Sequence, residues 1–443
     1  MPEYDFDPLF ARYRRDAILL YRPYPPLLKT STNSKFGGLP RLPADIAWPR
    51  DAHGTALHFL AQIDCSDIKI SSQLPDKGVL FFFGRDDEEQ LWADTPKSAS
   101  VIYSKEATAS TVHQSPPPDL PPIGGEYYKA YAWRNLLLAD EVGPNVHVEW
   151  PIQPLPIDSW PDTLFEDGPP ETASFDWRHL LKQLLERKPQ AESWQDEQKR
   201  YVAYTDRHEE LRNDAFVRAT GKPILEWNPL AGEREAAQRI FDHADAGPDA
   251  FPHFWIQIEY AVRTFIGSFG DRPTHGTYDE KHLLSARNWL RKAQASNGMT
   301  EVNAADKAAF RIWLMRLHKP RKGPPSPTPY AECVFHAARL NIRSWAGDPD
   351  LSAKITPIVY GAMEPYLSGN SAWGLQYAQM LGHAPSAQSP LHPDEPDICL
   401  LNLASDAALG WMFGDVGNAT FFIMPDALAK LDFSQVEADV VGH

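Results

Sequence analysis

The hydrophobic pattern changes its period twice along this chain, and that change constrains the fold more than any other feature. Short apolar runs bounded by Pro, Gly and Asp mark the N-terminal third, among them residues 57–68 (LHFLAQIDCSDI) and 78–86 (GVLFFFGRD). Runs this short favour buried strands over helices of several turns. From about Thr172 the apolar residues recur at three- and four-residue spacings, and strand-like sequence returns from Pro396. The pattern predicts two β-rich ends separated by a helical middle.

The helical middle contains six amphipathic segments separated by Gly and Pro. The first has a plausible N-cap at Ser174, because a serine hydroxyl can accept a hydrogen bond from a free amide at a helix start. No fixed repeat period relates the segments, so a solenoid is not indicated. We therefore divide the chain into an N-terminal half (1–170), a helical insertion (171–370) and a C-terminal half (371–443). The six segments are 175–187, 233–245, 254–266, 280–294, 306–318 and 332–346.

The two β-rich ends resemble each other. Residues 59–67 (FLAQIDCSD) and 399–407 (CLLNLASDA) both close an apolar run with polar turn residues. Residues 78–87 (GVLFFFGRDD) and 418–427 (NATFFIMPDA) then repeat an aromatic strand followed by acidic residues. We predict an α+β fold in which two related antiparallel β-rich halves form one domain, interrupted by the large helical insertion.

Composition limits the classes of partner and compartment. The 443 residues carry a formal net charge of −16, which disfavours binding to nucleic acids and to anionic membranes. No apolar run approaches the length of a membrane span, and the N-terminus does not resemble a secretory signal. The three cysteines are far apart and odd in number, which indicates neither a disulfide framework nor a zinc finger. We expect a cytoplasmic protein.

Several blocks of sequence carry a family resemblance. They are residues 34–49 (SKFGGLPRLPADIAWP), 57–68, 74–83, 379–388 and 400–423, followed by LDFS at 431–434. In order and spacing they resemble the YwqG-like family of bacterial proteins, a family of unknown function. The likeness covers Ser34 to Phe83 and Met380 to Ser434 and is weaker from Tyr103 to Trp150. Compact members of that family bridge the two halves with fewer residues than this chain.

The resemblance implies an α+β fold with antiparallel sheets from two related halves, and no known reaction. Members of the family occur near polymorphic toxin systems, which suggests an immunity-type role in which the protein binds a toxin and masks its active site.

Two glycine-rich stretches are interpreted as structural. Gly37 and Gly38 lack the third glycine and the following helix of a dinucleotide loop, and Lys35 precedes them, unlike a P-loop lysine. We expect both glycines to adopt positive φ, so that the chain crosses the sheet and buries Trp48 in the core. Similarly, Gly414 and Gly417 are expected to form a tight turn between two strands.

The sequence contains no convincing catalytic or metal-binding constellation. His208, Glu209 and Glu210 lack the second histidine of a zinc-binding helix, and most other histidines are expected to cap helices or lie at the surface. Cys65 lies between Asp64 and Asp67, a setting that raises a thiol pKa and lowers its reactivity. We therefore predict no catalytic residue, no metal and no cofactor.

Three possibilities remain open. The leading hypothesis is a non-catalytic cytoplasmic binding protein, an immunity or antitoxin-like factor whose acidic surface meets a basic protein partner such as a toxin. The alternative is an enzyme or small-ligand receptor with its site between the two β-rich halves. A third possibility, self-association through the helical insertion, leaves the oligomeric state open. The residues proposed to bind a ligand or partner are Lys35, Gln62, Asp64, Asp406, Trp411 and Asp415.

Overall fold

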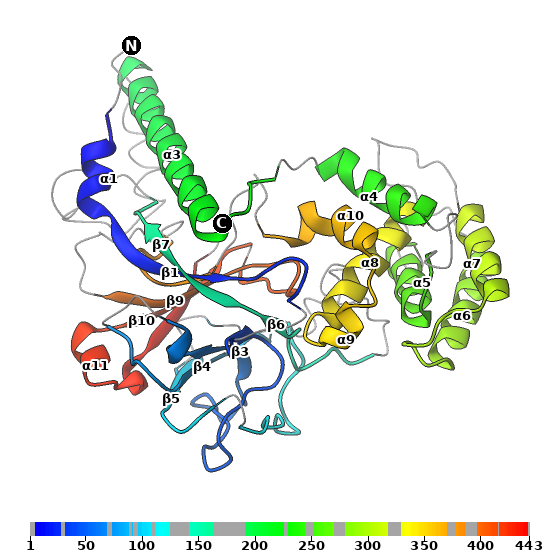
Figure 1. Cartoon of the computed structure of the whole chain (residues 1–443), viewed down its shortest axis with the longest axis horizontal. Coiled ribbons are helices and arrows are strands. Elements are labelled where there is room, and N and C mark those ends of the chain that lie inside the picture. Colours follow the sequence, from blue (N-terminus) through cyan, green and yellow to red (C-terminus); the bar gives the residue numbers. More distant parts are fainter. Residues whose placement is uncertain are drawn as a thin grey trace.

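A computed structural model shows two antiparallel sheets with helices over one sheet face and in a separate group beside the sheets (Figure 1). The helices, sheets and irregular segments make up an α+β protein, which confirms the predicted fold class. The structure describes residues 5–27, 32–68, 73–87, 91, 96–108, 111–124, 141–162, 191–225, 229–243, 251–269, 280–317, 329–369, 378–385, 397–414 and 416–441.

The five-stranded sheet comes from the N-terminal part of the chain. Its spatial order is β5-β4-β3-β2-β6, and every neighbouring pair is antiparallel. The apolar runs at 57–68 and 78–86 form its two central strands, which are buried along most of their length. The strands are β2 (Lys35–Phe36), β3 (His58–Asp64), β4 (Val79–Gly84), β5 (Ala99–Ser104) and β6 (Trp150–Pro151), and a 3-10 turn, η1 (Cys65–Asp67), follows β3.

The six-stranded sheet joins both ends of the chain. Its order is β11-β10-β9-β8-β1-β7, so two strands from the N-terminal region extend the meander formed by the C-terminal region. Pro154 and Pro156 lie in β7, the edge strand, where a missing backbone N–H leaves no neighbouring strand unpaired. The strands are β1 (Arg15–Tyr21), β7 (Gln153–Ser159), β8 (Ala378–Leu381), β9 (Ile398–Ala404), β10 (Asn418–Ile423) and β11 (Glu437–Val441).

The two meanders correspond strand by strand. In the five-stranded sheet Lys35 of β2 pairs with Gln62 of β3, and in the six-stranded sheet Gln379 of β8 pairs with Asn402 of β9. An aromatic strand follows in each case, β4 in one sheet and β10 in the other. The relationship between the halves that the sequence predicts is therefore present in the sheet topology.

The main core lies where the two sheets meet. Phe82 of β4 and Phe421 of β10 are fully buried and pack edge to face, with ring centroids 5.5 Å apart. Trp150 is also fully buried, and its indole N–H donates a hydrogen bond to the carbonyl of Pro23. Since such aromatic side chains bury large apolar areas, this junction fixes how the two sheets are placed.

The opposite face of the six-stranded sheet is covered by two helices, α1 (Asp7–Tyr13) and α3 (Ala191–Thr220). Strand β1 is buried on both sides because Ile18 and Leu20 face the main core, while Ala17 and Leu19 pack in a second cluster with residues of α3. Figure 1 shows α3 projecting beyond the sheet. Helix α3 is not among the helical segments that the sequence pattern predicts.

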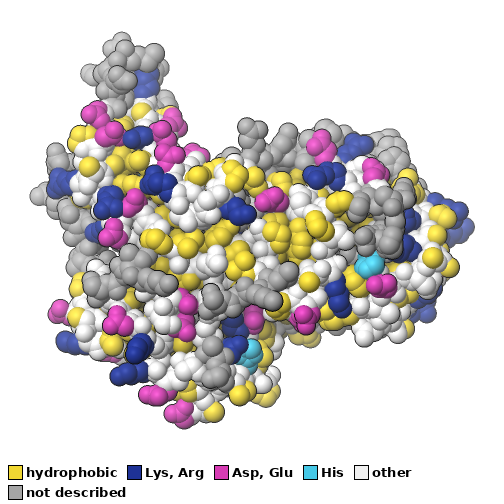
Figure 2. Space-filling model, viewed as in Figure 1, with side chains coloured by type: hydrophobic (Ala, Val, Ile, Leu, Met, Phe, Trp, Pro, Cys, Tyr) yellow, Lys and Arg dark blue, Asp and Glu magenta, His cyan; other side chains and the backbone are white. Residues whose placement is uncertain are grey.

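The remaining helices form a group beside the sheets (Figure 1). Five of the six predicted segments are helices in this group, and the sixth, 175–187, lies outside the described residues. Figure 2 shows hydrophobic side chains gathered on this face of the molecule between α3 and the group. The helices are α4 (Pro229–His243), α5 (Trp255–Phe269), α6 (Glu280–Gln294), α7 (Ala304–Arg316), α8 (Pro329–Trp345), α9 (Pro349–Ser352) and α10 (Pro357–Leu367).

Short elements complete the C-terminal region. Helix α11 (Pro425–Ala429) and the 3-10 turn η5 (Phe433–Gln435) connect β10 to β11. All three cysteines, Cys65, Cys333 and Cys399, are free and buried. Among the described residues, no helix has the length and apolar character needed to cross a membrane.

Candidate ligand-binding site

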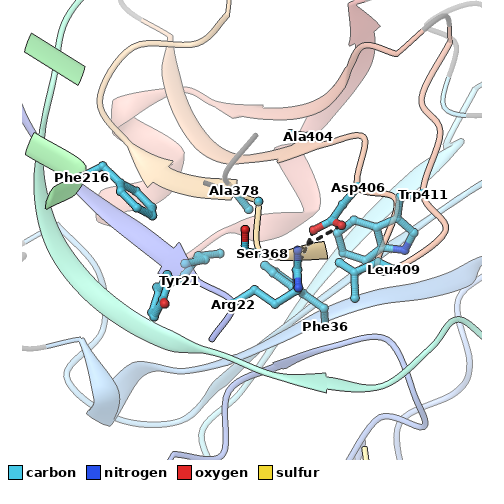
Figure 3. A pocket seen from close by; sticks show the side chains of 12 residues that line it. Tyr21, Arg22, Phe36, Phe216, Ser368, Ala378, Ala404, Asp406, Leu409 and Trp411 are labelled. Atoms are coloured by element: carbon cyan, nitrogen blue, oxygen red, sulfur yellow. Dashed lines mark hydrogen bonds and ion pairs between the residues drawn. The ribbon is translucent and has the colours of Figure 1, made fainter. Parts of the chain in front are cut away.

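A small pocket, partly open to solvent and about 20 Å³ in volume, lies where the two sheets meet helices α3 and α10. Both sheets and both helical regions contribute to its wall, so segments far apart in the sequence meet there (Figure 3). Two of the residues predicted to bind a ligand, Asp406 and Trp411, lie in this wall. The lining residues are Leu20, Tyr21, Arg22, Phe36, Phe216, Ser368, Gly369, Ala378, Ala404, Asp406, Leu409 and Trp411.

An ion pair between Arg22 and Asp406 forms the polar side of the pocket (Figure 3). Arg22 follows β1, and its Nε and Nη2 donate to the two carboxylate oxygens of Asp406 at 2.7 and 3.2 Å. Its Nη2 also donates to the carbonyl of Leu367 at 2.7 Å, at the end of α10. The guanidinium lies over the ring of Trp150, 4.6 Å from the ring centroid. These contacts fix the plane of the guanidinium from several sides.

Asp406 is held by its own loop. Its Oδ1 accepts a hydrogen bond from the backbone N–H of Ala408 at 2.7 Å. The backbone groups of Asp406 and Trp411 also bond to each other in both directions, at 3.0 and 3.1 Å. Gly410 has φ of +72° in this loop, a conformation that favours glycine. The loop therefore presents the Asp406 carboxylate and the Trp411 ring together to the pocket.

Two polar atoms in the pocket wall are buried without a hydrogen-bond partner. They are Nη1 of Arg22 and the side-chain oxygen of Ser368. Arg22 is 6% exposed and Ser368 8% exposed, so bulk water does not solvate these groups freely. Buried polar groups in proteins are nearly always paired, and an unpaired one costs stability. Both atoms are enclosed by the protein, so neither is presented to the space of the pocket.

Aromatic side chains form much of the apolar wall. Phe36 and Trp411 pack edge to face with ring centroids 5.1 Å apart, and Tyr21 and Phe216 do the same at 6.1 Å. Burial raises the pKa of the Tyr21 hydroxyl, while nearby Arg22 lowers it by a smaller amount. Tyr21 is therefore neutral at physiological pH. The pocket combines apolar rings with one charged pair.

A buried polar chain holds Trp411 from behind. The indole N–H of Trp411 faces Nδ1 of His147 at 3.2 Å, and Nε2 of His147 faces the buried carboxylate of Asp86 at 3.4 Å. Because an indole nitrogen can only donate, Nδ1 must accept, and the neutral imidazole carries its proton on Nε2. This tautomer points the proton at Asp86. The Trp411 ring is thus anchored on the side away from the pocket.

The other predicted site residues lie outside the pocket, in the five-stranded sheet. Lys35 donates to Glu149 at 2.7 Å and to the carbonyl of Leu39 at 2.8 Å, and burial lowers its pKa although Glu149 acts in the opposite direction. Phe36, the next residue in β2, faces the pocket, so alternation along the strand turns Lys35 away from it.

Gln62 and Asp64 bond to nearby loops. Gln62 accepts from the backbone N–H of Arg41 and donates to the carbonyl of Asn33, and the carboxylate of Asp64 accepts from the backbone N–H of Ser66. The structure therefore brings together Asp406 and Trp411 but not these three residues. Asp415 lies outside the described residues.

The glycines predicted to be structural make close backbone contacts. Gly37 and Gly38 have φ of +56° and +68°, and a Cβ on Gly38 would lie 2.0 Å from the carboxylate of Glu149. Gly414 has φ of +55° in the loop between β9 and β10. The carbonyl of Gly417 accepts hydrogen bonds from the backbone N–H and the hydroxyl of Ser405.

Trp48 is only partly buried, which differs from the expected core position. Its ring packs edge to face on Phe83, and its indole N–H donates to the carbonyl of Leu57 at 2.8 Å. The indole thus lies at the margin of a smaller cluster on the outer side of the five-stranded sheet, away from the junction of the sheets.

Four histidines are buried, although most histidines were expected to cap helices or lie at the surface. His58, His147, His208 and His383 are all at most 8% exposed. Burial lowers the pKa of His208 and His383 to about 4. These positions pack against other rings or bond backbone carbonyls, which the spacing of histidines in the sequence does not reveal.

The setting of Cys65 is unreactive for a reason beyond its acidic neighbours. Burial is the largest cause that raises the pKa of its thiol, to about 12, and Asp64 and Asp67 add to the shift. Among the described residues, no group of three or more His, Cys, Asp or Glu side chains is arranged to hold a metal ion.

A family model described as a domain of unknown function (DUF1963) matches residues 34–245 and 330–440, which together make up more than two thirds of the chain. The two matched regions include both β meanders and most of the pocket wall. Residues 246–329, within the predicted helical insertion, fall between them, and the boundaries predicted at residues 170 and 370 remain predictions. No curated protein sequence matches the chain.

Proposed function

Since the chain belongs to the family described as a domain of unknown function (DUF1963), we propose its function from the pocket itself: a non-catalytic receptor that binds a small ligand between the two β-rich halves. The observation that carries the proposal is the Arg22–Asp406 ion pair in the wall of a pocket with aromatic side chains. Ligand sites commonly combine an apolar concave wall with a few fixed polar groups.

The polar groups of the pocket favour binding over catalysis. Asp406 is the one carboxylate among the lining residues that the structure describes, and both of its oxygens already accept hydrogen bonds from Arg22. A general base needs an oxygen that can reach a substrate proton. The carboxylate instead positions the guanidinium.

A pocket-filling variant tests this proposal. Ala404 lines the pocket, so Ala404→Leu places three more carbons in it, and Ala353→Leu adds the same carbons at an exposed position of the surface. We expect a small-molecule collection screened by thermal shift to contain compounds that stabilise the native chain and the Ala353→Leu variant but not Ala404→Leu. A ligand at a hundred times its Kd adds about 2.7 kcal/mol of stability. If every compound that binds stabilises Ala404→Leu as much as Ala353→Leu, the pocket is not the receptor site.

The charge of the chain supports a second proposal, that it masks a basic protein partner in the manner of an immunity factor. The net charge of −16 would accelerate association with a basic surface. Affinity purification of the tagged chain from its native host, at low and at high salt, tests this. A basic protein recovered only at low salt supports masking, and recovery of no protein partner at either salt contradicts it.

We also propose that the chain is a bacterial, YwqG-like member of this family and acts in the cytoplasm. The quoted sequence blocks support the first point, and the free, buried state of all three cysteines is compatible with a reducing compartment. Fractionation of the native host followed by immunoblotting tests the location, and recovery in the extracellular fraction would overturn it.

A further inference from the structure

We infer that the outer face of helices α6 and α7 binds the surface of an anionic membrane as a peripheral contact. The inference goes beyond the proposed receptor function and does not depend on it. The face lies within residues 246–329, between the two regions that the family model matches. Its exposed side chains, which define the α6–α7 face, are Lys281, Leu284, Arg287 and Arg291 on α6 and Ala305, Ala308, Ile312, Met315 and Arg316 on α7.

Helices α6 and α7 pack side by side in opposite directions. Trp289 of α6 packs edge to face on Phe310 of α7, with ring centroids 5.1 Å apart. Lys292, three residues later in α6, forms an ion pair with Asp306, four residues earlier in α7. Contacts that advance along one helix therefore move back along the other, as in an antiparallel pair.

The outward sides of the two helices form one surface because both helices rest on α5. Phe265 of α5 packs edge to face on Trp313 of α7, with ring centroids 5.7 Å apart. Helix α5 also packs against α6, whose inner side buries Ala286, Leu290 and Ala293. The sides of α6 and α7 that point away from α5 are exposed and lie next to each other.

Apolar side chains occupy one level of this face. Leu284 is 58% exposed, Ile312 53% and Met315 52%. Leu284 lies five residues before Trp289 and Met315 five residues after Phe310, so the antiparallel packing places them at the same level. Ile312 and Met315 are three residues apart and share one side of α7. Helix α7 thus presents large apolar side chains to solvent, where the outer face of a surface helix is ordinarily polar.

Basic side chains surround the apolar ones. Residues 280–316 contain seven Lys or Arg and three Asp or Glu, so this region is positive in a chain of net charge −16. Of the two acids in the helices, Asp306 pairs with Lys292 and Glu280 is the first residue of α6. Among the described residues, no carboxylate forms an ion pair with the four exposed basic residues of the face. These are Lys281, Arg287, Arg291 and Arg316.

This combination favours a membrane over other partners. A second copy of the chain, packed face to face, would place the same basic residues against one another, which is unfavourable. A nucleic acid would neutralise the basic residues but would leave Leu284, Ile312 and Met315 without an apolar partner. An anionic bilayer offers negative headgroups to the basic residues and an acyl boundary to the apolar ones.

The acidic remainder of the chain does not prevent this contact. Figure 1 shows α6 and α7 at the end of the molecule that is farthest from α3 and the sheets, and Figure 2 shows Lys, Arg and hydrophobic side chains at that end. Charges farther apart than the Debye length, about 8 Å at physiological salt, are largely screened from each other. A helix with its side chains is about 10 Å thick, so the elements behind α6 and α7 lie beyond that distance from the membrane.

Co-sedimentation of the full chain with vesicles tests the inference. One set of vesicles contains phosphatidylcholine alone, and the other also contains phosphatidylserine. We expect the chain to bind the vesicles with phosphatidylserine, to bind them more weakly at high salt, and not to bind phosphatidylcholine alone. Binding to neither kind of vesicle, or equal binding to both, would overturn the inference.

A charge variant assigns the contact to this face. Arg287→Gln with Arg291→Gln should lower the affinity for the anionic vesicles at least about tenfold, because each basic residue near the surface adds to binding. Lys354→Gln with Lys430→Gln is the control, because it removes the same charge at exposed positions outside the face. Equal affinities of the two double variants would show that the face does not bind the vesicles.

An apolar variant tests the second part of the contact. Ile312→Ser with Met315→Ser should lower the affinity for the anionic vesicles, since these side chains would otherwise insert at the acyl boundary. Tyr201→Ser with Val202→Ser, at exposed positions of α3, is the control. Circular dichroism verifies that every variant is folded. An unchanged affinity of Ile312→Ser with Met315→Ser would contradict insertion into the membrane.

A soluble polyanion separates a membrane from an acidic protein partner. Poly-L-glutamate offers carboxylates without an acyl boundary. If it binds the native chain and the anionic vesicles do not, the face accepts an acidic protein and the membrane inference is wrong. If the vesicles bind, and Ile312→Ser with Met315→Ser weakens their binding but not that of poly-L-glutamate, the membrane inference stands.

Discussion

Removing the Asp406 carboxylate should destabilise the protein strongly. Asp406→Ala removes the acceptor of two hydrogen bonds from Arg22 and one from the backbone of Ala408. The larger effect is that Arg22, 6% exposed, keeps its charge in a buried position with no carboxylate beside it. Breaking one side of a buried ion pair typically costs about 3–5 kcal/mol. We expect a loss of free energy of unfolding in this range.

Urea unfolding followed by both tryptophan fluorescence and circular dichroism measures this loss. Coincident transitions and an unchanged m-value are required before the midpoints are converted to free energies. The double variant Arg22→Met with Asp406→Ala removes the uncompensated charge, so it should be more stable than Asp406→Ala alone. Asp119→Ala, which breaks an exposed ion pair with Arg50, is the control and should change the midpoint little. A loss below about 1 kcal/mol for Asp406→Ala would refute the reasoning.

Three further perturbations have defined outcomes. Gly38→Ala should lower the free energy of unfolding in urea by at least about 1 kcal/mol more than Gly221→Ala. Both glycines have positive φ, but only at Gly38 would the added Cβ meet a neighbouring atom within 4 Å. Equal losses in the two variants contradict the close contact. Lowering the pH from 6.5 towards 4 should destabilise the fold, because His383 takes up a proton in the unfolded chain but stays neutral when it is buried in the folded protein. The free energy of unfolding should therefore depend less on pH in His383→Gln. An unchanged pH dependence in this variant contradicts the lowered pKa. Ser405→Ala should lower the free energy of unfolding by about 1–3 kcal/mol, because the Phe413 N–H and the Gly417 carbonyl each lose the hydrogen bond they make with the serine hydroxyl. Ser368→Ala should change it by less than about 0.5 kcal/mol, because that hydroxyl has no partner. Equal thermal shifts for the two variants contradict this difference.

The strands and most helices follow from local periodicity. The runs at 57–68 and 78–86 are rich in apolar residues because β3 and β4 are buried on both faces, and that signal is visible in the sequence. Helix α3 was not predicted because its hydrophobic pattern is weak: it presents a few large residues such as Tyr204 and Phe216 to the sheet, and much of its remaining surface is polar.

The arrangement of the sheets was predicted only in part. The sequence indicates two related halves, but β1 and β7 belong to the N-terminal region and extend the C-terminal meander. Pairing of β1 with β8 joins strands more than 350 residues apart, and no local pattern encodes such a partner.

The same reason limits prediction of the site. Asp406 and Trp411 were proposed because they lie in a polar loop of a recognisable block, whereas Arg22 and Ser368 were missed. Arg22 follows the buried run of β1 directly, and a charged residue at that place is a signal that could have been used. Its partner Asp406 lies 384 residues away, so the pair becomes evident only in three dimensions.

The most direct test of the central claim is a crystal structure of the protein with the compound that stabilises it most in the thermal-shift screen. We predict that this compound lies against the ion pair between Arg22 and Asp406, with the pair intact. A compound bound elsewhere on the protein, with the pocket free of it at saturating concentration, would contradict the account.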